Sequence, residues 1–150
     1  MSNLLKQYIT FILTENKDKN KNLYIFGFVD SLYNYRKDKW NERVVSDISK
    51  AASDPNGITV LCTARAKEEK LVKETMKSLA SRGIKFDHYF FRDKNFKGTT
   101  PQYKTSIVKK MLKEDELIGK VFFWDDREDV LIDVKKVVYN KKYTAIKVTV

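Results

Sequence analysis

Two adjacent carboxylates, Asp125 and Asp126, follow directly after the bulky apolar run Val121–Trp124. Such a run predicts a buried strand of a parallel sheet, and open α/β sheets bind their ligands at the carboxyl ends of these strands. Neighbouring carboxylates repel each other unless a cation or a proton lies between them, and oxygen ligands suit Mg²⁺. The pair therefore predicts a metal site. In the alternative interpretation, an Asp caps a helix that begins near Arg127.

A hydroxyl group and a lysine stand at two further predicted element ends. Thr63 follows an apolar run and precedes Ala64-Arg65, after which we expect a helix. The hydroxyl, the free N–H groups of a helix start and Arg65 would together bind an anion, whereas in the alternative Thr63 is a plain helix cap. Lys104 falls in the first turn of an expected helix, where it opposes the helix dipole unless an anion lies nearby.

The elements that must position these residues alternate between apolar strands and amphipathic helices. This alternation predicts βαβ units, and hence an α/β fold: a three-layer α/β/α sandwich with a mainly parallel, Rossmann-type sheet. We expect strands at 23–29, 57–62, 88–91, 120–124 and 143–150, and helices at 4–13, 40–52, 66–82, 102–113 and 128–137. Residues 1–22 should form an N-terminal helix and a mobile linker, and residues 23–150 a single domain.

The charge of the chain points to its partners. Its 150 residues carry a net charge of +10 and include 42% hydrophobic residues, enough for one domain core. The charge favours an anionic partner, nucleic acid before acidic membrane surfaces, although a merely solvated lysine surface is the alternative. Without an apolar run of membrane-spanning length, we expect a soluble protein with no membrane partner. Cys62 is the single cysteine, which favours a reducing, intracellular compartment, by default the cytoplasm.

Four segments of the chain resemble the haloacid dehalogenase (HAD) superfamily of phosphohydrolases. Their order matches the four superfamily motifs: a site after the first strand, a strand leading to Thr63, Lys104 near a helix start, and a strand leading to Asp125-Asp126. Within the superfamily, the chain is similar to the HAD domain of the "Swiss Army Knife" RNA-repair proteins. The segments that carry this likeness are Trp40-Asn41, Leu61–Arg65, Thr99–Lys104 and Trp124–Arg127. The Asp-Asp-Arg element also resembles the 3′-phosphatase half of phage polynucleotide kinases.

The resemblance implies a role for each of these residues in a HAD-like domain. Asp125 would hold Mg²⁺ with support from Asp126 or Asp129, and no organic cofactor is expected. Thr63 would bind phosphate oxygens, and Lys104 would neutralise the charge shared by nucleophile and phosphoryl group. In the superfamily an Asp after the first strand attacks phosphorus, and a second Asp two residues later protonates the leaving group.

The chain departs from the superfamily at this first motif. The best alignment of Phe26–Tyr33 places Gly27 at the position of the nucleophile and Val29 at the position of the acid, so that both carboxylates are missing. In a second register Asp30 is the nucleophile and Leu32 occupies the position of the acid. The general acid is absent in either register, and this loss alone would slow the reaction by about 10²-fold to 10⁴-fold.

The segment after the first strand is too short to form a large cap domain, so we expect an open site. Aromatic and basic residues interleave there, a pattern typical of surfaces that bind single-stranded nucleic acid. The alternative is ordinary packing of the aromatic rings under a loop. The binding residues expected in and beyond this segment are Arg36, Lys37, Lys39, Trp40 and Arg65.

Two functions are compatible with these residues. The favoured one is a non-catalytic module with a degenerate first motif that binds nucleic acid, RNA before DNA, or a ribonucleoprotein assembly. The alternative is a Mg²⁺-dependent phosphohydrolase that acts on the phosphate ends of RNA, with Asp30, Thr63 and Lys104 as its catalytic residues.

Overall fold

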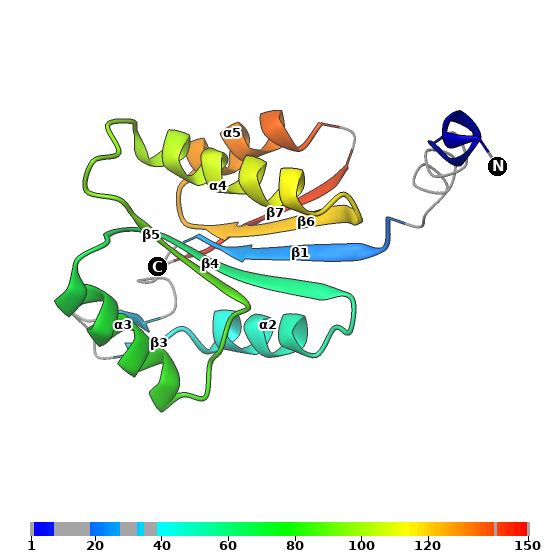
Figure 1. Cartoon of the computed structure of the whole chain (residues 1–150). Coiled ribbons are helices and arrows are strands. Elements are labelled where there is room, and N and C mark those ends of the chain that lie inside the picture. Colours follow the sequence, from blue (N-terminus) through cyan, green and yellow to red (C-terminus); the bar gives the residue numbers. More distant parts are fainter. Residues whose placement is uncertain (1, 8–18, 28–32, 35–38, 140, 150) are drawn as a thin grey trace.

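The computed structural model describes residues 2–7, 19–27, 33–34, 39–139 and 141–149. Its centre is a five-stranded sheet in the order β5-β4-β1-β6-β7 in which every neighbouring pair is parallel. The strands are β1 (Lys21–Phe26), β4 (Gly57–Ala66), β5 (His88–Arg92), β6 (Ile118–Asp125) and β7 (Lys142–Lys147). Helices α2 (Glu42–Ala52) and α3 (Glu69–Ser81) cover one face, and α4 (Thr100–Glu114) and α5 (Glu128–Val138) cover the other (Figure 1). The predicted three-layer α/β/α sandwich is confirmed.

The chain changes direction at β1, the central strand. It runs from β1 through β4 to β5 at one edge of the sheet, and then returns across α4 to β6 and β7 on the other side of β1. In open α/β sheets, ligands bind beyond the carboxyl ends of the strands at such a switch point. Here the switch point lies between β1 and β6, where Phe26 pairs with Trp124.

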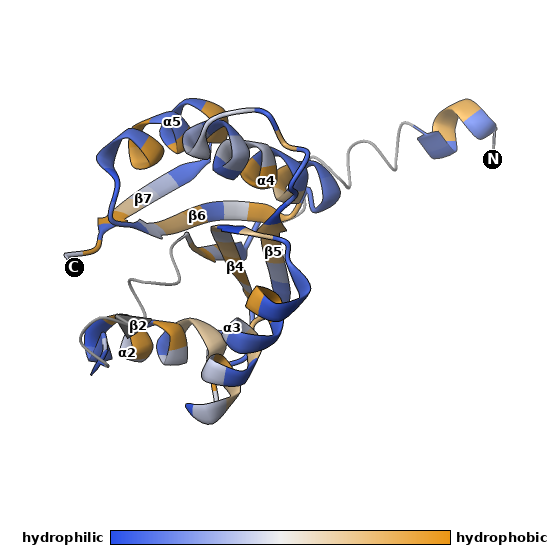
Figure 2. Cartoon of the chain, turned by 90° about the vertical axis from the view of Figure 1, so that its left-hand side faces the viewer, coloured by the Kyte–Doolittle hydropathy of each residue, from blue (hydrophilic) through white to orange (hydrophobic). Residues whose placement is uncertain are grey.

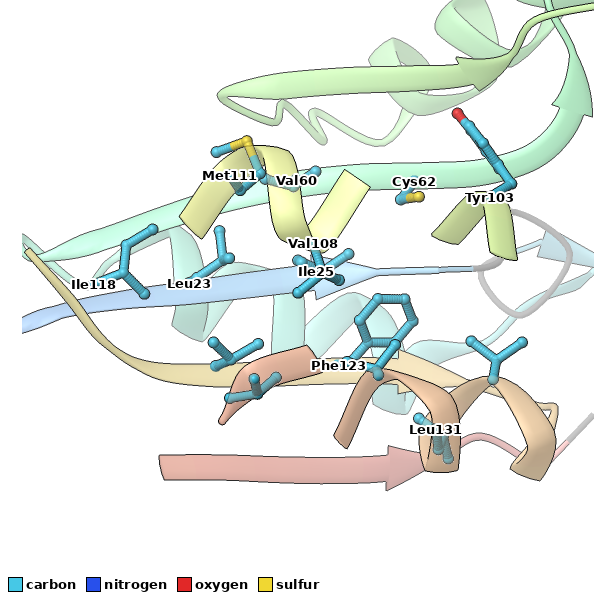
Figure 3. Packing of buried hydrophobic residues seen from close by; sticks show 14 residues of the cluster. Leu23, Ile25, Val60, Cys62, Tyr103, Val108, Met111, Ile118, Phe123 and Leu131 are labelled. Carbon is cyan, nitrogen blue, oxygen red and sulfur yellow. The ribbon is translucent and has the colours of Figure 1, made fainter. Parts of the chain in front are cut away.

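Both faces of the central strands are buried because their side chains are apolar on both sides. Leu23, Ile25 and Phe123 are fully buried in the cluster under α4 and α5, part of which Figure 3 shows. Phe26 and Trp124 point to the opposite cluster with α2, and their stacked rings lie 4.2 Å apart between centroids. In Figure 2 the hydrophobic colour predominates in β4 and in much of β6, whereas the helices show mixed colour.

The second predicted strand is longer than expected. β4 runs to Ala66 rather than to residue 62, and α3 begins at Glu69 rather than at residue 66. A bulge between Thr63 and Ala66 lets the strand continue to pair with β5, and the Lys67 N–H then donates to the Arg92 carbonyl at 2.7 Å. The expected helix start at residue 66 was therefore wrong, because pairing with β5 keeps this segment extended.

Smaller differences concern the first strand and its surroundings. β1 begins at Lys21 rather than at residue 23, and a short antiparallel hairpin of β2 (Tyr33–Asn34) and β3 (Lys39–Trp40) follows it. Of the N-terminal helix predicted over residues 4–13, residues 4–7 are helical, and the helix already begins at residue 3. Residues 8–13 of that helix, residues 15–18 of the predicted linker and residues 28 and 29 of the first predicted strand lie outside the described residues. None of the described helices is long and apolar enough to cross a membrane.

Helix α4 carries Lys104 and has a well-formed start. The Thr99 hydroxyl accepts a hydrogen bond from the Gln102 N–H at 3.3 Å, and the Gln102 side chain accepts one from the Thr99 N–H at 2.7 Å. This reciprocal capping box satisfies two N–H groups that a helix start leaves without partners. The helix begins at Thr100, so Lys104 is its fifth residue and lies beyond the first turn in which it was expected.

We predict that Thr99→Ala lowers the free energy of unfolding by about 1 kcal/mol, because the helix loses its cap. Urea denaturation measures this change, and Thr99→Ser is the matched control because it keeps the hydroxyl. If Thr99→Ala and Thr99→Ser are equally stable, the capping box does not hold the start of α4.

Candidate functional site

A buried ion pair lies at the carboxyl end of β6. Lys104 Nζ donates to Asp125 Oδ2 at 2.5 Å, and the two side chains are only 1% and 0% exposed. α4 delivers the lysine because Tyr103, Val108 and Met111 pack the same helix against the sheet. The structure thus brings together two of the predicted site residues, each neutralising the other.

The second oxygen of Asp125 is also engaged. Its Oδ1 accepts a hydrogen bond from the Arg127 N–H at 2.9 Å. Burial raises the pKa of Asp125 to about 6, while the charge and hydrogen bond of Lys104 and the Arg127 N–H act in the opposite direction. Burial destabilises the charged carboxylate, and the ammonium compensates for only part of this effect.

Gly27 lies directly against this pair. Its N–H donates to the Trp124 carbonyl at 2.8 Å, which continues the pairing of β1 with β6 by one residue. A Cβ atom at this position would lie 2.5 Å from Asp125 Oδ2 and 2.5 Å from a ring carbon of Phe123. The position that aligns with the superfamily nucleophile therefore has no room for a side chain in this packing.

Thr63 and Arg65 lie in the bulge of β4 rather than at a helix start. Thr63 is 2% exposed, and its hydroxyl accepts a hydrogen bond from the Arg65 N–H at 3.1 Å. The Arg65 guanidinium donates to the Thr75 hydroxyl on α3 at 3.2 Å. Thr63 therefore does not stand at a helix N-terminus, and the anion site predicted there is absent. Its hydroxyl still lies toward the carboxyl end of β4.

The three predicted metal ligands have different partners. Asp129 accepts two hydrogen bonds from the Arg127 guanidinium, at 3.1 and 2.7 Å, and these hold the pKa of its carboxyl below the usual value. Asp126 Oδ1 is buried and has no hydrogen-bond partner in the described part of the chain. Asp125 is neutralised by Lys104.

A Mg²⁺ ion, which the superfamily resemblance implies, does not fit this arrangement. The described residues contain no group of three His, Cys, Asp or Glu side chains that could hold a metal ion. Among the described residues, Asp126 Oδ1 is a buried carboxylate oxygen without a hydrogen-bond partner, and the Lys104 ammonium at Asp125 would repel a divalent cation placed between the two carboxylates. Mg²⁺ is usually held by one or two carboxylates with water completing its near-octahedral shell, and Asp125 is paired with Lys104 instead.

Of the basic and aromatic residues expected after the first strand, the structure describes Lys39 and Trp40. Lys39 is exposed, whereas Trp40 is half-buried against the cluster under α2 and has the Arg82 guanidinium 5.3 Å from its ring centroid. This position supports the packing alternative for Trp40. Two other expected binding residues, Arg36 and Lys37, and the expected nucleophile Asp30 lie outside the described residues.

Sequence reasoning missed two buried groups, one of which lies beside the ion pair. Cys62 is fully buried close enough to Lys104 and Asp125 to feel both charges, and burial raises the pKa of its thiol to about 12. The Tyr103 hydroxyl is buried without a hydrogen-bond partner among the described residues, and burial raises its pKa too. Both residues lie within apolar stretches of the sequence, so their residue types did not indicate a polar site.

We predict that Lys104→Met lowers the free energy of unfolding by about 3–5 kcal/mol at pH 7.5, because it leaves a carboxylate buried without its partner. The double variant Lys104→Met/Asp125→Asn should lose less than the sum of the two single variants. Chemical denaturation measures the cycle, with the exposed Lys109→Met on the same helix as control. Additive losses would show that the two charges do not depend on each other.

The titration of Asp125 gives a second prediction. Its carboxyl carbon should titrate with a midpoint near 6 in NMR spectra, and Asp129 should titrate below the usual Asp value in the same spectra. Because its pKa is higher in the folded than in the unfolded state, the stability that Asp125 contributes falls as the pH rises from about 4 to the folded-state value. A midpoint at or below that of an ordinary Asp would contradict this account.

Comparisons with known proteins agree with this fold. Two solved structures of the Pnkp1/Rnl/Hen1 RNA repair complex contain chains with a similar fold, with TM-scores of 0.56 and 0.57 at 23% and 21% identity. The matches cover 85% and 88% of this chain but only 43% and 49% of those chains, so it spans less than half of their length. No curated protein matches the sequence.

The family comparison covers nearly the whole chain. Residues 13–150 match the family described as HAD domain family 1 in Swiss Army Knife RNA repair proteins. The match includes every strand of the sheet and both residues of the buried ion pair. The chain therefore belongs to this HAD family of the RNA-repair proteins.

Proposed function

We propose that the chain is a non-catalytic HAD domain that binds RNA within an RNA-repair or ribonucleoprotein assembly. The observation that carries the proposal is the close approach of Gly27 to Asp125 and Phe123. A nucleophilic carboxylate at position 27 would require both side chains to move, and both are fully buried. A HAD domain without room for the nucleophilic carboxylate can keep the fold, but it cannot carry out the covalent step in which that carboxylate attacks phosphorus.

The buried ion pair supports the same proposal. In the superfamily the lysine neutralises the reacting groups, whereas here Lys104 is committed to Asp125 at 2.5 Å. Both side chains are almost completely buried, which removes them from a phosphate in solution. The charge that remains useful for binding is the net +10 of the whole chain.

Two findings favour RNA and an assembly over DNA and an isolated protein. The family is described from RNA repair proteins, and the similar chains come from an RNA repair complex. A strongly basic domain binds polynucleotides through their phosphates, which gives affinity without sequence preference. An intracellular, reducing compartment stays a prediction from the single cysteine.

A phosphohydrolase that acts on the phosphate ends of RNA is the second candidate. The buried oxygen of Asp126 without a partner in the described residues favours it, since such an atom suits a site that is completed by another group. This reading requires the Asp30 carboxylate as nucleophile, with Lys104 released from Asp125.

One experiment separates the two candidates. We expect single-stranded RNA to bind with a dissociation constant of roughly 10⁻⁴–10⁻⁶ M at physiological salt and more weakly as salt increases. With 3′-phosphorylated RNA and Mg²⁺, phosphate release should not exceed the rate without protein. Sustained release that Asp30→Ala and Asp125→Asn both abolish would establish the phosphohydrolase instead. Failure to bind RNA at low salt would refute the binding function.

A further inference from the structure

Four lysines surround a hollow at the amino ends of β6 and β7. The buried ion pair lies at the opposite, carboxyl end of β6. The hollow has a volume of about 330 Å³ and is lined by Gly119 and by Lys19, Lys120, Lys141 and Lys142. Three of the lysines are exposed and Lys141 is partly buried.

Two of these lysines stand directly opposite each other. Lys120 on β6 and Lys142 on β7 are register partners in the parallel pair. Like charges on neighbouring strands destabilise a sheet. Among the described residues, no carboxylate forms an ion pair with Lys19, Lys120, Lys141 or Lys142, whereas Lys21 nearby is paired with Asp115 at 2.8 Å. The hollow therefore concentrates positive charge, which Asp115 offsets only in part through its effect on the pKa of Lys141.

The hollow is held in place by backbone contacts. A Cβ atom on Gly119 would collide with the Lys19 carbonyl, so the glycine lets the segment before β1 lie against β6. The Lys21 N–H donates to the Leu117 carbonyl at 3.1 Å and fixes the same approach (Figure 1). Lys141 Nζ donates to the Ile118 carbonyl at 2.5 Å. Burial, and next the nearby charge of Lys19, lower the pKa of Lys141.

We propose that this lysine hollow binds phosphate groups of a polynucleotide strand, at a surface remote from the buried pair at Asp125. Lysines bind phosphates as point charges, and a bound phosphate would relieve their mutual repulsion. Along β6 the hollow lies roughly 17 Å from Asp125 at the usual strand rise. The inference rests on the proposed function for the nature of the polyanion, while the hollow itself is a separate feature.

The experiment compares two double variants of equal charge. Lys120→Gln/Lys142→Gln removes two lysines of the hollow, and Lys70→Gln/Lys73→Gln removes two exposed lysines of α3, where Lys73 is paired with Glu69 at 3.0 Å. The first variant should bind single-stranded RNA about tenfold more weakly and lower the salt slope of binding by about 2, since each phosphate contact contributes about 1. The control should stay close to the wild type.

Thermal unfolding at low salt checks that the first variant is folded. Its melting temperature should equal or exceed that of the wild type, because the substitutions relieve repulsion between facing lysines. If both variants bind RNA equally well, the hollow proposal fails while the proposed function stands.

Binding of inorganic pyrophosphate, measured by shifts of the backbone amide signals in NMR spectra, tests the hollow without RNA. If the wild type does not bind RNA and pyrophosphate shifts Gly119, Lys120 and Lys142, the proposed function and the polynucleotide are wrong and the anion site stands. If pyrophosphate leaves these amides unchanged as well, both proposals fail. Equal binding of an acidic peptide at the hollow would overturn the choice of a polynucleotide.

Discussion

The pairing of Lys104 with Asp125 inside the protein is the interaction on which the rest of the site depends. Removing an ammonium and a carboxylate from water is costly, and only close contact and further hydrogen bonds compensate for it. α4 must therefore pack against the sheet at one position along the strands, and β6 must end where Asp125 meets both the lysine and the Arg127 N–H. The capping box at Thr99 and the apolar face of α4 fix that position.

The same pair explains how a HAD fold can persist beside an altered first motif. In this packing Asp125 and the Phe123 ring occupy the space that a side chain at position 27 would need, and Gly27 lets the two strands pair up to their ends. A glycine in a strand usually weakens it, unless another group must approach closely. Here the group that approaches is the carboxylate of Asp125, which is paired with Lys104.

The lysines at the two ends of β6 differ in burial and in pairing. At the carboxyl end a lysine is buried and neutralised by Asp125, while at the amino end four lysines face a hollow without carboxylate partners among the described residues. The buried charge contributes to a defined architecture and is sensitive to its partner. The exposed charge at the hollow is the one that we propose binds a polyanion, and such binding would respond to salt because exposed charges are screened.

Local patterns were sufficient to predict the layers of the fold and the position of Asp125 at the end of a strand, because buried parallel strands must be apolar and polar residues mark their ends. They failed where pairing with a distant segment decides the outcome, as in the extension of β4 along β5. They also missed the ion pair that Asp129 forms with Arg127, two residues away in the chain. The register of β6 and β7, which sets Lys120 against Lys142, is likewise invisible in the sequence. Residue types are a property of the sequence, whereas the partner that each charge meets depends on contacts between residues far apart in the chain, which only the tertiary structure establishes.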